Sequence, residues 1–164
     1  MKKAFIISLC AVFFLQVLLT LSGCGTAEIQ RESVIQTKTA TETEVIPMKK
    51  TLKLFINGID VPVTWQNTAT LDALKELAED GIEIKMTMYG GFEQVGPIGK
   101  SLPRSDARIT TESGDIVLYS GDQIVIFYGS NTWSYTRLGH IDLSEREMAD
   151  LLSHKSVVIE LKYE

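Results

Sequence analysis

The stretch Gly-Asp-Ile-Val-Leu-Tyr-Ser-Gly-Asp-Gln-Ile-Val-Ile-Phe-Tyr-Gly, at residues 114–129, decides the fold of this chain. Residues 116–119 and 123–128 are dense in β-branched and aromatic side chains, which favour strands. Between them, Gly121 and Asp122 match a two-residue hairpin turn that tolerates positive φ. A near-continuous apolar run such as residues 124–127 is typical of a strand that is buried on both faces or lines a barrel, because a half-exposed strand alternates. The sequence therefore predicts a buried hairpin around which the rest of the chain packs.

The N-terminus has the pattern of a secretory signal. Lys2 and Lys3 precede an uninterrupted apolar or neutral run at residues 4–21, and Leu-Ser-Gly-Cys follows at residues 21–24. These last four residues resemble a bacterial lipobox, which implies that Cys24 is acylated and becomes the first residue of the mature protein. An uncleaved transmembrane anchor is the alternative, but small residues directly before a lone cysteine favour the lipoprotein. We therefore expect a signal peptide at residues 1–23 and a lipid-anchored protein on the extracytoplasmic face of the cell membrane.

The mature domain is expected to contain no thiol. The chain has two cysteines, of which Cys10 leaves with the signal peptide and Cys24 is consumed by the lipid. Disulfides, thiol redox chemistry and cysteine nucleophiles are thereby excluded for the folded domain. Its stability must come from a packed core.

Residues 25–50 differ in composition from both flanking segments. They are rich in Thr, Glu, Gln, Ser and Lys, and they contain no aromatic residue. This composition is typical of a flexible linker, and its equal numbers of acids and bases argue against an arm that binds lipid by charge. We therefore expect a linker at residues 24–50 and one domain at residues 51–164.

The charge of this domain limits its partners. Residues 51–164 contain ten Lys or Arg and seventeen Asp or Glu, a net charge of −7. Such a balance argues against nucleic acid as a partner and against docking on anionic lipid, which leaves the acyl anchor as the membrane contact. His140 and His154 lie well apart in a domain without cysteine, so neither a metal nor a cofactor is expected.

The remaining elements predict a mainly β domain. Asn57 and Gly58 form a strong hairpin signal, and Pro62 places the second strand of that hairpin at an edge or a bulge. A first helix is expected at residues 70–79 with Thr70 as its N-cap, and a second at residues 144–153. Many short strands with two helices predict a closed antiparallel barrel capped by helices. The expected strands are residues 52–56, 61–65, 82–88, 109–111, 135–141 and 156–162, together with the hairpin at 114–129.

Several separated motifs occur in order along the domain. They are Tyr-Gly-Gly-Phe-Glu at 89–93, Gly-Pro-Ile-Gly at 96–99, Ser-Leu-Pro-Arg at 101–104, Thr-Thr-Glu-Ser-Gly-Asp-Ile-Val-Leu-Tyr at 110–119, and the run at 124–141 that contains Trp-Ser-Tyr-Thr-Arg. Together they resemble the small bacterial cyclophilin-like domains, and the resemblance covers essentially all of residues 51–164. It implies a cyclophilin-like barrel of about eight strands with two helices, in a group whose members occur alone, as lipoproteins or beside flavodoxin-like domains.

The resemblance does not carry a catalytic residue into this chain. True cyclophilins isomerise X–Pro bonds with an arginine set in a Phe-His-Arg and Gln-Gly-Gly signature, and neither motif is present. Isomerisation needs no proton transfer, so an arginine in an aromatic groove could still stabilise the twisted amide. Arg104 and Arg137 are the candidates for this role.

The segment at residues 89–108 is predicted to be a long loop, and loops of this length are usually functional or mobile. Its functional interpretation is one wall of a cleft, with Tyr89 and Phe92 as apolar surfaces, Glu93 as a polar anchor and Arg104 as a ligand for an anion or carbonyl. The structural interpretation is that its glycines make bends while Phe92 plugs the end of the barrel.

The segment at residues 129–137 is the second candidate wall. Asn131 could bind a peptide amide, Trp133 could offer a flat face and Arg137 could pair with a carboxylate. Alternatively, Trp133 and Tyr135 simply fill the barrel, since the burial of one such ring stabilises a domain by roughly 1.5–3 kcal/mol. The cleft hypothesis requires that Phe92, Arg104, Trp133 and Arg137 converge on one concavity.

These observations predict a lipid-anchored, extracytoplasmic binding module for a peptide or a small carboxylated ligand. A weak peptidyl-prolyl isomerase is the alternative, and an accessory domain of a membrane-associated complex is a third possibility. Whether the domain is an enzyme stays open at this point.

Overall fold

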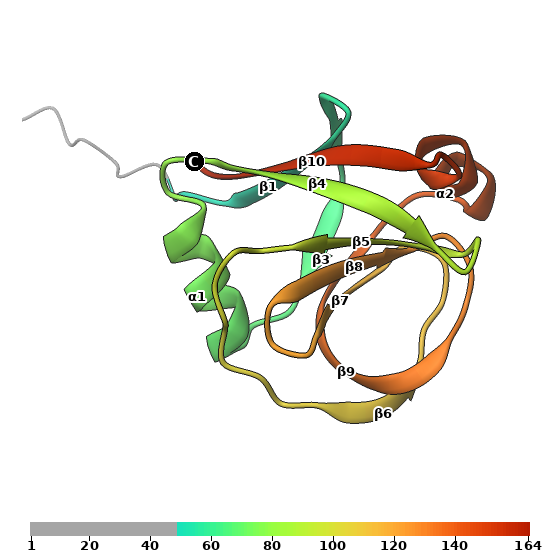
Figure 1. Ribbon diagram of the computed structural model, residues 1–164. Helices are drawn as coiled ribbons and strands as arrows, with labels where there is room; N and C mark the ends of the chain where they lie inside the picture. The colour runs from blue at the N-terminus through green and yellow to red at the C-terminus, as the bar shows by residue number, and fades with distance from the viewer. Residues whose placement is uncertain (1–48) are drawn as a thin grey trace, which may run out of the picture. The chain divides into compact units, whose positions relative to one another are not determined.

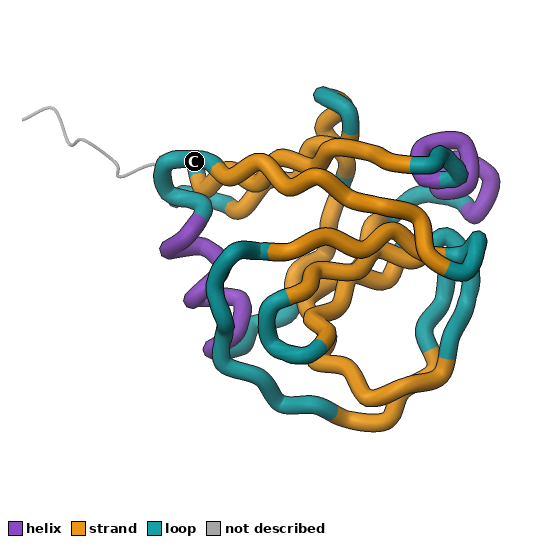
Figure 2. Tube along the Cα trace, in the orientation of Figure 1, coloured by secondary structure: helices purple, strands orange, loops and turns teal. Residues whose placement is uncertain are grey.

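The structure is a computed structural model that describes residues 49–164 (Figures 1 and 2). The expected signal peptide, Cys24 and nearly all of the expected linker lie outside the described residues. The described residues form one compact unit, which contains the hydrophobic core. No helix in the described part of the chain is long and apolar enough to cross a membrane.

The described chain is mainly β, as the sequence predicts. Nine of its strands form one continuous antiparallel order, β2-β1-β10-β4-β5-β8-β7-β9-β3, and β6 pairs with β9 off this path. The strands are β1 Leu52–Ile56, β2 Ile59–Val61, β3 Val63–Trp65, β4 Ile82–Tyr89, β5 Glu93–Pro97, β6 Ala107–Thr110, β7 Asp115–Tyr119, β8 Gln123–Phe127, β9 Thr132–Ile141 and β10 Ser156–Tyr163.

The two ends of this strand order meet in the sequence at Pro62. β2 pairs with β1, whereas β3 pairs with β9, and only Pro62 separates β2 from β3. Because proline has no backbone N–H, it interrupts the ladder at the point where the chain changes partner. The expected edge or bulge at Pro62 is therefore a strand break, and through it the sheet becomes a nearly closed barrel.

The hairpin of β7 and β8 is part of this barrel, between β5 and β9, and its turn lies one residue earlier than predicted. Ser120 and Gly121 have φ values of 54° and 89°, and the Asp122 N–H donates to the Tyr119 carbonyl at 3.3 Å. The central residues of the turn are thus Ser120 and Gly121. The prediction had placed them at Gly121 and Asp122, because a Gly-Asp pair also suits a turn with positive φ.

Both faces of the hairpin are buried, which confirms the interpretation of its apolar run. Ile116, Leu118, Ile124 and Ile126 belong to the main core. Their sequence neighbours point to the other face and form a smaller cluster, in which Val117, Val125 and Phe127 pack with Tyr135 of β9. Side chains alternate along a strand, so a strand with apolar neighbours on both faces needs a continuous apolar sequence.

The segments predicted as cleft loops are partly strands, and that part of the prediction is wrong. β5 lies within residues 89–108 and pairs with both β4 and β8. Gly90 and Gly91 have φ values of 62° and 77° and supply the tight turn before it. A Cβ on Gly96 would lie 2.5 Å from Met86 Sδ, so a glycine allows β5 to lie close against β4. Likewise, β9 begins at Thr132 and includes most of the segment at 129–137.

The two helices lie at opposite sides of the strands in Figure 1. Helix α1 spans Ala69–Leu77, and its N-cap is Thr68, whose side chain accepts the Leu71 N–H at 3.2 Å. The prediction of Thr70 as N-cap is therefore wrong; Thr70 is buried in the first turn. Helix α2 spans Glu145–Leu152 and begins with a capping box between Ser144 and Glu147, close to the predicted helix.

Truncation of Ile126 to alanine should destabilise the domain by about 2–5 kcal/mol, because the side chain is fully buried and a cavity would remain in the main core. Urea unfolding of fragment 45–164, followed by circular dichroism, measures this loss. Ile59→Ala is the matched control: Ile59 is 54% exposed, and its substitution should change the free energy of unfolding by no more than about 0.5 kcal/mol. Equal losses in the two variants would contradict the burial of this face of the hairpin in the main core.

Candidate functional site

A hollow of about 510 Å³ lies on the outer face of the hairpin, over the smaller hydrophobic cluster. Its size is that of a site for a small molecule or a few peptide residues. The lining comes from the end of β4, from β5, β7 and β8, and from β9 and the residue before it. The lining residues are Tyr89, Glu93, Val95, Tyr119, Gln123, Val125, Asn131, Trp133 and Tyr135.

The two-residue period of the strands explains this lining. On β5, Glu93 and Val95 face the hollow, whereas Gln94 between them is fully buried and donates to the Leu152 and His154 carbonyls at 2.7 and 2.6 Å. On β8, Gln123 and Val125 face the hollow while Ile124 and Ile126 face the main core. Alternation therefore gives each strand one set of residues for the core and another for the hollow.

Exposed aromatic rings surround the hollow. The described residues contain four exposed large hydrophobic side chains, and three of them, Tyr89, Tyr119 and Trp133, line this site. Tyr89 is 67% exposed and Trp133 is 53% exposed. Single exposed apolar residues are ordinary on protein surfaces, but a group gathered around one concavity indicates a binding surface.

Tyr135 forms the aromatic floor of the hollow. Its ring meets those of Phe127 and Tyr119 edge to face, at centroid distances of 5.7 and 6.0 Å. The Asn131 Nδ2 donates to the Tyr135 hydroxyl at 3.0 Å. Burial, followed by the nearby charge of Glu93, raises the pKa of the Tyr135 phenol above its usual value. The phenol therefore stays neutral and available as a hydrogen-bond donor.

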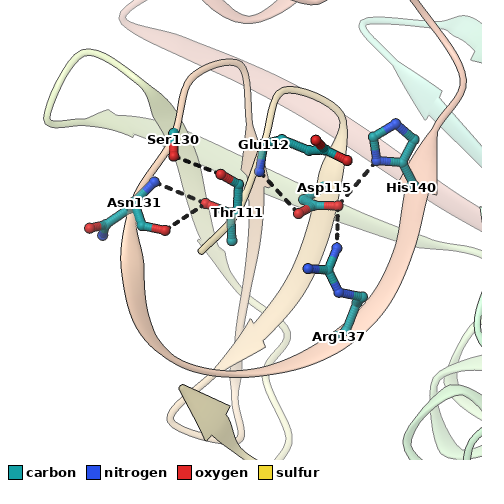
Figure 3. Close-up of polar contacts among 7 residues, drawn as sticks. All are labelled: Thr111, Glu112, Asp115, Ser130, Asn131, Arg137 and His140. Atoms are coloured by element: carbon teal, nitrogen blue, oxygen red, sulfur yellow. Dashed lines mark hydrogen bonds and ion pairs between the residues drawn. The ribbon is translucent and has the colours of Figure 1, made fainter. Parts of the chain in front are cut away.

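Asn131 is held at the edge of the hollow by Thr111. The Thr111 hydroxyl accepts the Asn131 N–H at 3.0 Å and donates to the Asn131 carbonyl at 3.1 Å, while the Ser130 hydroxyl donates to the Thr111 carbonyl at 2.7 Å (Figure 3). These contacts fix the backbone just before β9. The Asn131 amide therefore keeps its position beside Tyr135.

Glu93 is the buried acid of the site. Its side chain lines the hollow, yet the residue is only 5% exposed, and its Oε2 atom has no hydrogen-bond partner among the described residues. Burial raises the pKa of the Glu93 carboxyl to about 7. A buried carboxylate without a partner is unfavourable, because the charged form loses its hydration and gains nothing in return.

The structure brings together four of the seven residues proposed as ligand contacts, namely Tyr89, Glu93, Asn131 and Trp133. The other three do not line the hollow. Phe92 stacks on Phe127, with ring centroids 6.5 Å apart, and lies against Gly129. Arg104 lies near Gly121, where its Nε is 3.5 Å from Asp106 Oδ2.

Arg137 is engaged by a buried carboxylate instead of facing the hollow. Its guanidinium Nη1 donates to Oδ1 of Asp115, which is 1% exposed, and His140 Nδ1 lies 3.1 Å from the same oxygen (Figure 3). Of Phe92, Arg104, Trp133 and Arg137, only Trp133 therefore reaches the concavity. The cleft expected between two long loops is not formed, and the hollow is a site of different composition.

The group around Asp115 also includes Glu112, and one donor atom from each of Glu112, Asp115 and His140 lies within 4.8 Å of the others. Carboxylate and imidazole are metal ligands in general. Here, however, the Arg137 guanidinium already pairs with Asp115 and would repel a metal ion. Asp115 also accepts the Glu112 N–H at 3.1 Å, so the group joins β7 to β9 as an ion-pair network.

Sequence reasoning missed four of the residues that line the hollow, namely Val95, Tyr119, Gln123 and Val125. The alternative in which Tyr135 fills the barrel agrees with its burial at 5% exposure, and the same ring also lines the hollow. The alternation of Gln123, Val125 and Phe127 on one face of β8 was available from the sequence. What it could not show was that β5 and β9 pair with the two edges of the hairpin and present side chains on that same face.

The domain is thus a mainly β protein, a nearly closed antiparallel barrel with two helices and an aromatic hollow. The model of the Cyclophilin-like family matches residues 54–162. The chain therefore belongs to the cyclophilin-like family, as its motifs had indicated. A comparison with curated protein sequences gave no match.

Glu93→Gln should remove a pH-dependent loss of stability. The Glu93 pKa is raised from 4.5 to about 7 in the folded state, so unfolded chains lose the proton first and stability falls as the pH rises from about 4.5 to about 7. The penalty above pH 7 is on the order of 3 kcal/mol. The free energy of unfolding of the Gln variant minus that of the wild type should thus increase between pH 5 and pH 8.

Urea unfolding of both proteins at several pH values measures this difference, in which the titration of all other groups cancels. Glu83→Gln, an exposed residue of β4, is the control. A difference between wild type and Glu93→Gln that does not change with pH would show that Glu93 is not desolvated.

Proposed function

We propose that this chain is a lipid-anchored, extracytoplasmic binding module that takes a peptide segment or another small ligand in the aromatic hollow. One observation carries the proposal: the hollow contains a buried acid, Glu93, whose Oε2 has no hydrogen-bond partner among the described residues. Such an atom is costly for the fold, and a ligand that donates a hydrogen bond would offset the cost.

The remaining lining supports a peptide. The rings of Tyr89, Tyr119 and Trp133 provide apolar surfaces, and the side-chain amide of Gln123 provides a donor and an acceptor near them. A peptide presents the same mixture, because each backbone unit carries one N–H, one carbonyl and an apolar or polar side chain. A few convergent polar groups among apolar walls are typical of a small-ligand site.

A carboxylated ligand receives less support than the sequence suggested. Its recognition would require a cation, and no Lys, Arg or His is among the described residues that line the hollow. The ionised form of Glu93 would repel it as well. Of the two ligand classes expected from the sequence, the peptide is therefore the one that we propose.

Isomerase activity is likewise less well supported than binding. The two arginines considered for stabilising a twisted amide are both paired with acids, Arg104 with Asp106 and Arg137 with Asp115. Neither reaches the hollow. Within the described residues, the site therefore offers aromatic surfaces and hydrogen bonds but no cation for the amide oxygen.

Tyr89→Ala should weaken peptide binding at least about tenfold, because it removes a largely exposed ring from the rim of the hollow. A tenfold change in Kd corresponds to about 1.4 kcal/mol of binding free energy. The test uses ¹⁵N-labelled fragment 45–164 and the capped tripeptides Ac-Ala-Ala-Ala-NH₂ and Ac-Ala-Pro-Ala-NH₂. The domain has two tryptophans, so the indole N–H of Trp133 reports on the hollow. The indole of Trp65, which donates to the Leu52 carbonyl at 2.8 Å, is the internal reference.

Ile59→Ala is the matched control, because Ile59 is similarly exposed but lies outside the hollow, and it should leave peptide binding unchanged. If the peptides shift neither the indole signal of Trp133 nor the NMR signals of other residues of the hollow, the proposal is contradicted. The proline peptide is also assayed for isomerisation. Acceleration that is lost on Arg104→Ala or Arg137→Ala would overturn the binding-only view.

The proposed anchor rests on the sequence of the leader. Basic residues, an apolar run and Leu-Ser-Gly-Cys follow one another at residues 2–24. Cys24→Ala in the full chain, expressed in a bacterial host, should abolish incorporation of labelled palmitate and leave the leader uncleaved, because the acylated thiol is missing. Metabolic labelling and the mass of the product measure both effects. Cys10→Ala is the matched control and should label normally; equal labelling of the Cys24 variant would contradict the anchor.

A further inference from the structure

We propose that the group which the hollow recognises is an alkylammonium, such as the side chain of a lysine in a bound peptide, held opposite the Glu93 carboxylate among the surrounding aromatic rings. The inference rests on the proposed function, since it assumes that the hollow binds a ligand, and it names the chemistry of that ligand. The sequence had suggested the opposite charge, a carboxylate paired with Arg104 or Arg137.

Glu93 provides the anionic end of the site. The residue is only 5% exposed at the wall of the hollow, and its buried Oε2 atom is without a hydrogen-bond partner in the described part of the chain. A neutral amide would supply one hydrogen bond, but it would leave the negative charge uncompensated. An ammonium supplies both the hydrogen bond and the compensating charge, and charge-assisted hydrogen bonds are roughly twice as strong as neutral ones.

The other groups around Glu93 do not compete for this role. The titratable groups that face the hollow from the neighbouring strands are the phenols Tyr89 on β4, Tyr119 on β7 and Tyr135 on β9, while β8 contributes the neutral Gln123. The lining contains no Lys, Arg or His and no second acid within the described residues. A bound cation would thus meet one carboxylate and no repelling charge.

The aromatic walls favour a cation as well. The π-faces of Trp and Tyr carry partial negative charge and attract an ammonium, with Trp the strongest of the side chains. Three tyrosines and Trp133 line one hollow, which gives a ligand cation several faces to approach. The methylenes of a lysine side chain would at the same time cover the apolar surfaces of Val95 and Val125.

The net charge of the domain points in the same direction. Residues 51–164 carry ten basic and seventeen acidic side chains, and this excess of negative charge attracts cations at long range. The same charge disfavours the approach of a carboxylated ligand. The lining of the hollow and the net charge of the domain therefore both favour a positively charged ligand.

The proposal predicts the direction in which affinity changes with pH. An ammonium binds the ionised form of Glu93, so its affinity should rise about tenfold per pH unit below the carboxyl pKa of about 7 and level off above it. An alkylammonium, with a pKa near 10.4 as in lysine, stays charged throughout this range. A carboxylated ligand would show the opposite trend, and a neutral amide would show little.

The experiment titrates ¹⁵N-labelled fragment 45–164 with n-butylammonium, n-butyrate and N-methylbutanamide at pH 5.5, 6.5 and 8, with the indole N–H of Trp133 as the reporter. Ac-Lys-NHMe and Ac-Ala-Lys-Ala-NH₂ form a second arm, which distinguishes a free amine from a lysine in a peptide. We expect n-butylammonium to bind at least tenfold more tightly than the amide at pH 8, and the lysine peptide more tightly than the amine.

Glu93→Gln should remove the preference for ammonium and its pH dependence, while the amide still shifts Trp133. Glu83→Gln, the exposed acid of β4, should change neither. The indole signal of Trp65 confirms that each variant is folded. Glu93→Asp is a second variant that keeps the charge, and it should retain the direction of the pH dependence.

The outcomes separate this inference from the proposed function. If the amide and the neutral peptides shift Trp133 but ammonium binds no better, or loses affinity as the pH rises, the inference is wrong and the binding module stands. A preference for n-butyrate would likewise overturn the inference and restore the carboxylated ligand. If no probe shifts the residues of the hollow, both proposals are wrong.

Discussion

The burial of the β7–β8 hairpin on both faces is the constraint on which the rest of the structure depends. One face of β7 and β8 is covered by the main core, and the other is covered by the cluster around Phe127 and Tyr135. Two apolar faces need two layers of neighbours, so the sheet must curl back over its own centre. Pro62 allows that curl, because it lets the chain leave β1 and join β9 at the far end of the strand order.

The hollow arises because the apolar cluster on the second face of the hairpin, opposite the main core, covers that face only in part. The cluster on the outer face is small, and it gives way to the exposed rings of Tyr89, Tyr119 and Trp133 instead of to further core. Glu93 stands at this boundary, buried enough for its carboxyl pKa to rise to about 7 by desolvation. An apolar residue there would favour stability more, and a buried acid with a raised pKa at the wall of a hollow is typical of a functional site.

The two arginines show how tertiary contacts decide the role of a charged residue. From the sequence, Arg104 and Arg137 were the evident ligands for an anion or a carbonyl. In the folded chain Asp106 and the buried Asp115 lie beside them, and each arginine pairs with its acid. Asp115 needs this partner, because a buried carboxylate left alone is strongly unfavourable. Arg137 thus joins β9 to β7, and the hollow is left without a cation in its described lining.

The sequence by itself determined the mainly β character, the buried hairpin and the second helix, because alternation, capping residues and turn dipeptides act over a few neighbouring positions. The order of its motifs indicated the family. The sequence also singled out Tyr89, Glu93, Asn131 and Trp133. Only the tertiary structure decided that residues 93–97 form a strand, that Thr68 caps the first helix, and that Val95, Tyr119, Gln123 and Val125 join those four around one hollow. The physical reason is that pairing between β5 and β8, or between β9 and β7, joins residues far apart in the chain. Which faces then meet depends on the register of strands, and no local pattern encodes it.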